Sequence, residues 1–166
     1  MHFLKHSTLD MDLLASELAI SRATLYRAAG GREPLLGEVF WAIGRLFLAE
    51  AGDEATGSGP DRVIEVSRLF AELVATAQQL KQFVAAEPQT AARVLLTTAT
   101  EVHERAVRAQ LEIFEESGLA GDPDDMRHRA FLYVRLMESV VYSDVLGVPQ
   151  VPFALAEPAL RALLPA

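Results

Sequence analysis

The sequence predicts an all-α protein in which a small helix-turn-helix head precedes a larger helical body. From about residue 36 onward, apolar residues recur at intervals of three and four, the period of helices that pack along one face. The segments between them are short loops rich in glycine, proline and acidic residues, at 52–60 and 117–125. No segment shows the alternation typical of a strand, so we expect helices throughout.

The head is predicted over residues 9–36, LDMDLLASELAISRATLYRAAGGREPLL. This pattern indicates a helix, a tight turn, a second short helix, a glycine break and the start of a longer helix. Asp10 and Ser21 stand where N-cap residues accept hydrogen bonds from the first turns of the two short helices. Ala19 to Ser21 form the turn, and Ile20 is expected to pack as an apolar plug between the helices.

The second short helix carries side chains that suit a DNA major groove. Arginine reads guanine edges, hydroxyl groups bind phosphates, and a short helix after a three-residue turn can enter the groove. Leu25 is expected to face inward. The residues expected to meet DNA are Ser21, Arg22, Ala23, Thr24, Tyr26 and Arg27, with Arg32 on the flanking phosphates.

At these residues the chain resembles the TetR family of one-component transcriptional repressors. The matching pieces are Leu14-Ala15, Ile20-Ser21, Thr24-Leu25-Tyr26 and Arg32-Glu33-x-Leu35-Leu36. The run SRATLYR followed by GxRExLL is similar to the QsdR-like branch of that family. The resemblance implies a DNA-binding head and a helical body that dimerises and binds a small-molecule effector.

The head departs from the family pattern at three places. Ala19 stands where the family usually has glycine, so a left-handed turn there would be mildly strained. Ala28 and Ala29 replace the usual aromatic pair. Only residues 1–5 precede Ser7-Thr8, where the family has a full helix, so we expect the first helix of the head to be truncated.

Charge is distributed unevenly along the chain. Residues 1–45 hold five basic and five acidic residues, whereas the remainder holds ten basic and eighteen acidic ones and carries the whole net charge of −8. A neutral head on an acidic body favours site-specific DNA binding over general coating of nucleic acid. We expect a DNA-binding head over residues 1–46 and an effector-binding and dimerisation domain over residues 47–166.

The body is predicted to consist of helices separated by glycine and proline breaks. Asp122 is placed to cap one of them, with Pro123 in its first turn. Their expected ranges are 32–50, 61–85, 89–116 (in one piece or two), 123–146 and 153–164.

The apolar faces of these helices carry scattered aromatic and polar residues. A ligand pocket needs apolar walls with a few polar groups that orient the ligand, although each such residue could equally be an ordinary core residue. The family resemblance implies a small apolar effector, with a lactone as one example. The expected pocket residues are Trp41, Phe70, Leu73, Phe83, His103, Tyr133, Met137 and Tyr142.

The helix predicted over 124–146 is apolar around much of its circumference. One face can pack on its own body and another on a second copy of the chain, the alternative being a central helix of a monomer. The resemblance implies a homodimer held by a four-helix bundle that this helix forms with the last one. The expected interface residues are Leu132, Leu136, Val140, Leu160 and Leu164.

The sequence offers little support for catalysis or metal binding. The four histidines show no paired ligand spacing, no glycine pattern forms a phosphate loop, and no serine has a nucleophile-elbow context. We therefore expect no enzyme, no metal and no cofactor. With no cysteine, no signal peptide and no apolar run of roughly 18 residues, we expect a cytoplasmic protein without a membrane partner.

Together these patterns predict a regulator that binds a double-stranded DNA operator and represses transcription until an effector releases it. Two alternatives remain open. One is a headless helical dimer that binds a ligand or a protein without stable DNA contact. The other is a small helical enzyme, which would need a catalytic pair in the pocket.

Overall fold

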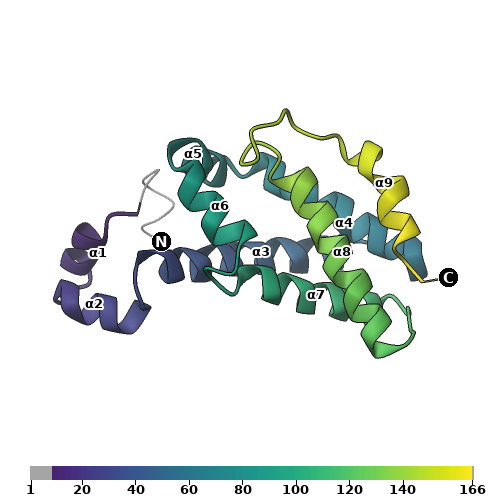
Figure 1. Cartoon of the computed structure of the whole chain (residues 1–166), viewed down its shortest axis with the longest axis horizontal. Helices are drawn as coiled ribbons and strands as arrows, with labels where there is room; N and C mark the ends of the chain where they lie inside the picture. The colour runs from purple at the N-terminus through teal and green to yellow at the C-terminus, as the bar shows by residue number, and fades with distance from the viewer. Residues whose placement is uncertain (1–8, 166) are drawn as a thin grey trace.

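The computed structural model describes residues 9–165, and every regular element in that range is an α-helix (Figure 1). The predicted all-α class is confirmed. The expectation that the first helix of the head is truncated concerns residues 1–8, which lie outside the described range. The helices are α1 (Met11–Glu17), α2 (Arg22–Ala29), α3 (Arg32–Glu54), α4 (Gly59–Thr76), α5 (Gln78–Ala86), α6 (Pro88–Leu96), α7 (Val102–Glu116), α8 (Pro123–Val141) and α9 (Phe153–Ala162).

Two of the predicted body helices are divided in the structure. The range 61–85 breaks at Ala77, whose ψ of 82° ends α4, and the chain resumes as α5. The range 89–116 forms α6 and α7, which are separated by the turn at 97–101. A third helix is shorter than predicted, because α8 ends at Val141 and irregular turns follow to Gly147.

The head and the body share one hydrophobic core. Leu9, Met11 and Ala15 of the first segment and Leu25 of α2 belong to one core cluster with residues of α3, α5 and α6. The apolar faces of the two short helices are therefore anchored to the body. The body members of this cluster are Leu36, Phe40, Phe83, Val84, Ala91, Val94 and Leu95.

A second core fills the opposite end of the molecule, between α4, α7, α8 and α9. Phe114 and Tyr133 meet edge to face there, with ring centroids 5.6 Å apart, and both are completely buried. Leu160 fixes α9 to the same cluster. Figure 1 shows α1 and α2 at one end of an elongated molecule and α9 at the other.

The helix α3 belongs to both halves, because it starts beside the head and continues beneath the body (Figure 1). The division of the chain expected between residues 46 and 47 falls inside this uninterrupted helix. That division stays a prediction. Within residues 9–165, none of the helices is long and apolar enough to cross a membrane.

Candidate nucleic-acid interface and ligand cavity

Capping side chains set the start of both short head helices. Asp10 Oδ1 accepts hydrogen bonds from the backbone N–H groups of Asp12 and Leu13, at 2.8 and 3.1 Å. Ser21 Oγ accepts from the Thr24 N–H at 3.1 Å and lies 2.8 Å from the Thr24 hydroxyl. Both predicted N-caps are confirmed, and each satisfies backbone donors that the helix itself leaves free.

The turn between α1 and α2 places one alanine in a left-handed conformation. Ala19 has φ 52°, so the left-handed conformation considered for this position is present, in a region that L side chains enter only at a steric cost. The prediction for Ile20 was wrong: its side chain is 38% exposed and does not plug the turn. The buried side chains of the two helices are Met11, Ala15 and Leu25.

The exposed face of α2 carries the side chains that sequence reasoning assigned to DNA. Ser21 at its N-cap and Arg22, Ala23, Tyr26 and Arg27 are exposed, whereas Thr24 is half-buried and Leu25 is turned into the core as predicted. Gly30, with φ 71°, ends the helix and donates its N–H to the Tyr26 carbonyl. The result is a two-turn helix that stands at one end of the molecule with an open polar face.

Arg22 is held in place on that face by two neighbours. Its guanidinium lies over the Tyr26 ring, 5.3 Å from the centroid, and forms an ion pair with Asp12 at 3.1 Å. The hydrogen bond to the Tyr26 hydroxyl, followed by the Asp12 charge, raises the pKa of Arg22. Since Arg22 and Asp12 are both well exposed, a phosphate or a base edge could replace the carboxylate at little energetic cost.

Arg32 lies in the junction between the head and the body, apart from the open face of α2. Its Nε donates to the Leu9 carbonyl at 2.9 Å, and its terminal nitrogen pairs with Glu87, the residue between α5 and α6. Both side chains are largely buried. Sequence reasoning could not anticipate this pair, because its members are 55 positions apart.

A small, partly open hollow of about 80 Å³, which we call the inner cavity, lies between α3, α4, α6, α7 and α8. Most of its wall is aliphatic, and the polar residues on it are Ser67, Gln110, Glu138 and Tyr142. The other lining residues are Leu48, Val66, Phe70, Leu95, Val102, Ala106, Ile113, Val134, Met137 and Val141.

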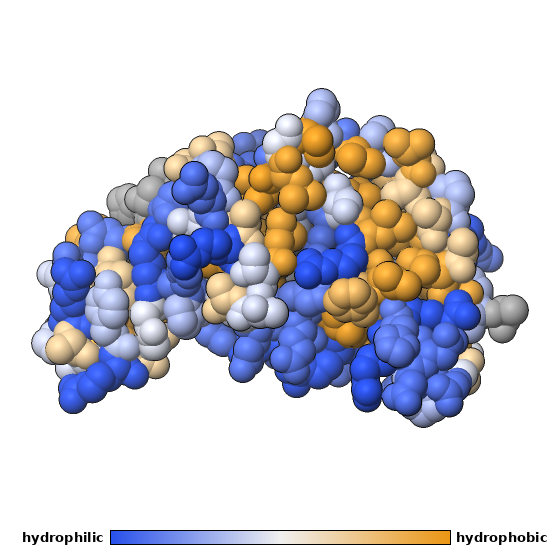
Figure 2. Space-filling view, viewed as in Figure 1, coloured by the Kyte–Doolittle hydropathy of each residue, from blue (hydrophilic) through white to orange (hydrophobic). Residues whose placement is uncertain are grey.

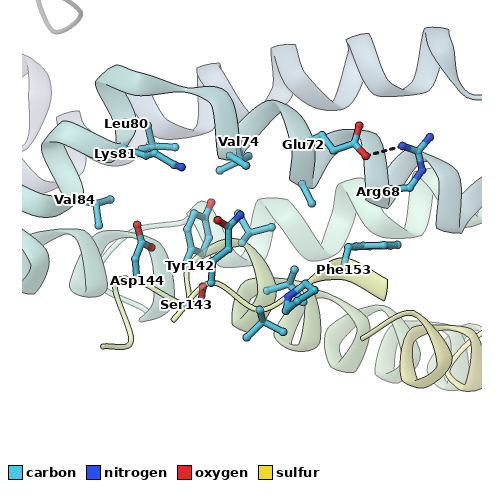
Figure 3. A pocket seen from close by; sticks show the side chains of 17 residues that line it. Arg68, Glu72, Val74, Leu80, Lys81, Val84, Tyr142, Ser143, Asp144 and Phe153 are labelled. Atoms are coloured by element: carbon cyan, nitrogen blue, oxygen red, sulfur yellow. Dashed lines mark hydrogen bonds and ion pairs between the residues drawn. The ribbon is translucent and has the colours of Figure 1, made fainter. Parts of the chain in front are cut away.

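An outer groove of about 640 Å³ opens between α4, α5, the end of α8 and the segment leading into α9 (Figure 3). Its rim carries the ion pair between Arg68 and Glu72, at 2.6 Å, and the side chains of Lys81 and Asp144. The remaining lining residues are Ala71, Val74, Ala75, Leu80, Val84, Val140, Val141, Tyr142, Ser143, Gln150, Val151, Pro152 and Phe153.

The structure distributes the expected pocket residues over several environments. Phe70, Met137 and Tyr142 line the inner cavity. Phe83 and Tyr133 are fully buried in the two cores, and His103 lies beside α8 at the start of α7. Trp41 and Leu73 are half-buried and line neither the inner cavity nor the outer groove.

A polar network borders the inner cavity. Glu138 accepts from Arg135 at 2.8 Å and lies 2.7 Å from His103 Nδ1, while Arg135 also donates to the Leu96 carbonyl. Burial, together with the negative charge of Glu138, raises the pKa of Tyr142. Sequence reasoning missed Glu138 and Gln110 as cavity residues, although both interrupt otherwise apolar helix faces.

The expected dimer residues divide into two groups. Leu132 is 50% exposed and Leu136 half-buried, so both are on the surface of α8. Val140, Leu160 and Leu164 are buried in the chain's own second core, so they cannot face a partner in this conformation. The sequence could not show which faces of α8 and α9 are exposed, because apolar residues lie on several sides of these helices.

A helix-turn-helix head with an open polar face, joined by one long helix to a helical body, is an architecture found in one class of transcriptional regulators. Residues 58–165 match the model of the tetracyclin repressor-like C-terminal domain. The chain therefore belongs to the TetR family, a family of transcription factors rather than enzymes.

The fold is also similar to a solved structure, that of the R. erythropolis transcriptional repressor QsdR from the TetR family. The TM-score is 0.85 at 25% sequence identity, over 94% of this chain and 84% of that one. No curated protein sequence matches the chain. The predicted resemblance to the QsdR-like branch is confirmed. Within the described residues, no group of three or more acidic or histidine side chains could hold a metal ion.

Proposed function

We propose that this protein is a cytoplasmic repressor that binds a double-stranded DNA operator as a homodimer and is released by a small apolar effector. The observation that carries the proposal is the exposed face of α2, where Arg22, Tyr26 and Arg27 stand around a helix capped by Ser21. Arginine on such a helix can bind guanine edges, and the hydroxyl groups can bind phosphates. Arg32 would reach a flanking phosphate only by leaving Glu87.

The outer surface of α8 and α9 supports the homodimer. Phe131, Leu132 and Leu155 on these helices are 43%, 50% and 74% exposed. Figure 2 shows hydrophobic residues gathered over the half of the molecule that holds α8 and α9. An apolar patch on a two-helix face suits a self-complementary contact in which each copy contributes the same surface.

The inner cavity supports the effector. Its walls are mainly aliphatic and its few polar groups are fixed by the surrounding helices, as is typical of small-molecule sites. QsdR of R. erythropolis is a transcriptional repressor, and a lactone is the first effector class to test for this chain. The effector would act by favouring one arrangement of the two heads over another.

The proposal is tested by a mobility shift of the protein on the DNA upstream of its own gene, with competitor DNA and two salt concentrations. If Arg22 or Arg27 reads a base, Arg22→Ala and Arg27→Ala should each weaken binding by about 1–3 kcal/mol. Arg127→Ala is the matched control, since Arg127 is an exposed arginine on α8, far from the head in the chain. Unchanged affinity in both head variants would refute the assignment.

The alternative of a helical dimer without stable DNA contact also has an observation in its favour. Leu13, Leu18 and Ile20 are 42%, 54% and 38% exposed, so the head carries uncovered apolar side chains. A two-helix head with that much apolar exposure is less stable than one that buries it. A specific dimer that binds ligand but shifts no DNA at either salt concentration would favour this alternative.

A further inference from the structure

The inner cavity and the outer groove share part of their lining: Val141 and Tyr142, at the end of α8, belong to both. We infer that the two hollows form one bipartite site for an uncharged amphiphile. Its carbonyl or hydroxyl oxygen is held by Gln110 in the inner cavity, and its aliphatic chain extends past Tyr142 into the outer groove. This inference rests on the proposed effector function and adds the class of ligand and its orientation.

Gln110 supplies the reason for placing an oxygen in the inner cavity. It lies on the α7 face that borders the cavity and is only 8% exposed. Its side-chain Nε2 is buried and has no acceptor among the described residues. A buried amide donor without a partner is costly, so a ligand oxygen that accepts from it is favoured over an aliphatic group.

The charged residue of the cavity explains why the ligand is uncharged. The Glu138 carboxylate is already satisfied by Arg135 and by the ring of His103. A second carboxylate beside it would be repelled, and an ammonium group would find its partner already occupied. Burying either one without a partner is strongly unfavourable, whereas a ketone, ester or alcohol needs only one hydrogen bond.

The sizes of the two hollows explain why the ligand extends beyond the inner cavity. The cavity holds about 80 Å³, well below the roughly 300 Å³ at which small-molecule pockets begin, whereas the groove holds about 640 Å³. Much of the lining of the groove is apolar, including Ala71 and Ala75 of α4 and Phe153 at the start of α9.

Tyr142 lies where the two parts meet. It follows the last residue of α8, donates its N–H to the Glu138 carbonyl, and stands among the groove side chains in Figure 3. Its side chain therefore belongs to the wall that the two hollows share.

The test uses three methyl ketones, 2-butanone, 2-heptanone and 2-undecanone, titrated into the full chain by calorimetry. We expect the affinity to rise by roughly fourfold per added methylene as the chain enters the groove. Gln110→Leu should lower it by about two- to tenfold for all three ketones, because each loses the same hydrogen bond. Ala75→Phe fills the groove and should weaken only the longer ketones.

The two variants serve as controls for each other, and thermal melts establish that both are folded. Absence of ketone binding to the wild-type chain, unchanged affinity in Gln110→Leu, or an equal loss for short and long ketones in Ala75→Phe would each overturn the bipartite site. Decanoate, a charged chain of similar length, should bind at least tenfold more weakly than 2-undecanone. Equal binding would overturn the requirement for an uncharged ligand.

A mobility shift with and without 2-undecanone separates this inference from the proposed function. Ketone binding that follows the expected pattern in a chain that shifts no DNA leaves the site standing and refutes the repressor. A specific DNA shift without any ketone binding refutes the bipartite site and leaves the repressor proposal standing. If the chain binds the ketones and also shifts DNA specifically, release of the DNA by 2-undecanone would show that the bipartite site is the effector site of the repressor.

Discussion

Arg32 and Glu87 join the first turn of α3 to the break between α5 and α6. The same guanidinium donates through Nε to the carbonyl of Leu9, just ahead of α1. One arginine thus connects the head, the long helix and the part of the body that carries Lys81 and Val84 on the wall of the outer groove.

Glu87→Ala should lower the free energy of unfolding by about 1–3 kcal/mol, because it leaves the largely buried Arg32 without its carboxylate. Asp12→Asn is the matched control: it removes an ion pair whose side chains are 61% and 66% exposed, and it should cost about 0–1 kcal/mol. Urea denaturation measures both. Equal losses would mean that the Arg32–Glu87 pair adds nothing beyond a surface contact.

Gly37 on α3 is predicted to tolerate no side chain. An added Cβ would lie 2.9 Å from the Cβ of Thr100, so Gly37→Ala should destabilise the fold by about 1–3 kcal/mol. In the same helix, a Cβ at Gly44 would meet nothing within 4 Å. Gly44→Ala should therefore stabilise by about 0.5–1 kcal/mol through helix propensity alone. Melting temperatures that shift in the same direction in both variants would contradict the close approach of α3 to Thr100.

Ala19→Gly should raise the free energy of unfolding by up to about 1 kcal/mol, because glycine adopts φ 52° without the steric cost that alanine bears. Ala42→Gly is the control, at an exposed position within α3, where glycine should cost about 0.5–1 kcal/mol. The midpoints of denaturant unfolding, compared at equal m-values, measure the change in stability of both variants. A loss of stability in Ala19→Gly would indicate that the turn relaxes in solution.

Alkaline pH should destabilise the protein through Tyr133. Burial raises the pKa of Tyr133 to about 12, from an ordinary value of about 10, although the hydrogen bond with Ser67 offsets part of this effect. The folded chain therefore binds this proton more tightly than the unfolded chain. That contribution is fully present below pH 10, and about 2–3 kcal/mol of it is lost as the pH rises from 10 to 12.

Tyr133→Phe provides the test, because phenylalanine cannot titrate. The variant should lose about 0.5–1.5 kcal/mol at neutral pH, where the 2.8 Å hydrogen bond to Ser67 is missing. Its stability should then fall less steeply than that of the wild type between pH 10 and 12. Parallel pH profiles would show that Tyr133 does not set the alkaline limit.

Local chemistry made part of this fold predictable from the sequence. Asp10, Ser21 and Asp122 cap their helices through hydrogen bonds to residues two or three positions ahead, and such contacts depend on little else. The break at Ala77 lay beyond prediction, because the sequence there has neither glycine nor proline to mark it. The burial of Ile20 was overestimated, because an apolar residue in a turn packs only if the tertiary structure covers it.

The lining of the inner cavity was only partly predictable, for a related reason. Val102, Ala106, Gln110 and Ile113 recur at helical spacing and all line the inner cavity, so Gln110 was visible as a polar residue within an apolar stripe. Aromatic residues such as Phe83 carried no such mark, and the structure places Phe83 in the first core. A polar exception on an apolar face was the more informative signal.

Trp41 is the single tryptophan of the chain, half-buried on α3 at a position that lines neither the inner cavity nor the outer groove. Its indole emission can therefore report changes in the packing of α3 without direct quenching by a bound ligand. The chain also has no cysteine, so one thiol introduced on α2 would be a unique attachment point for an acceptor dye. The natural sequence thus permits optical measurement of head movement with a single substitution.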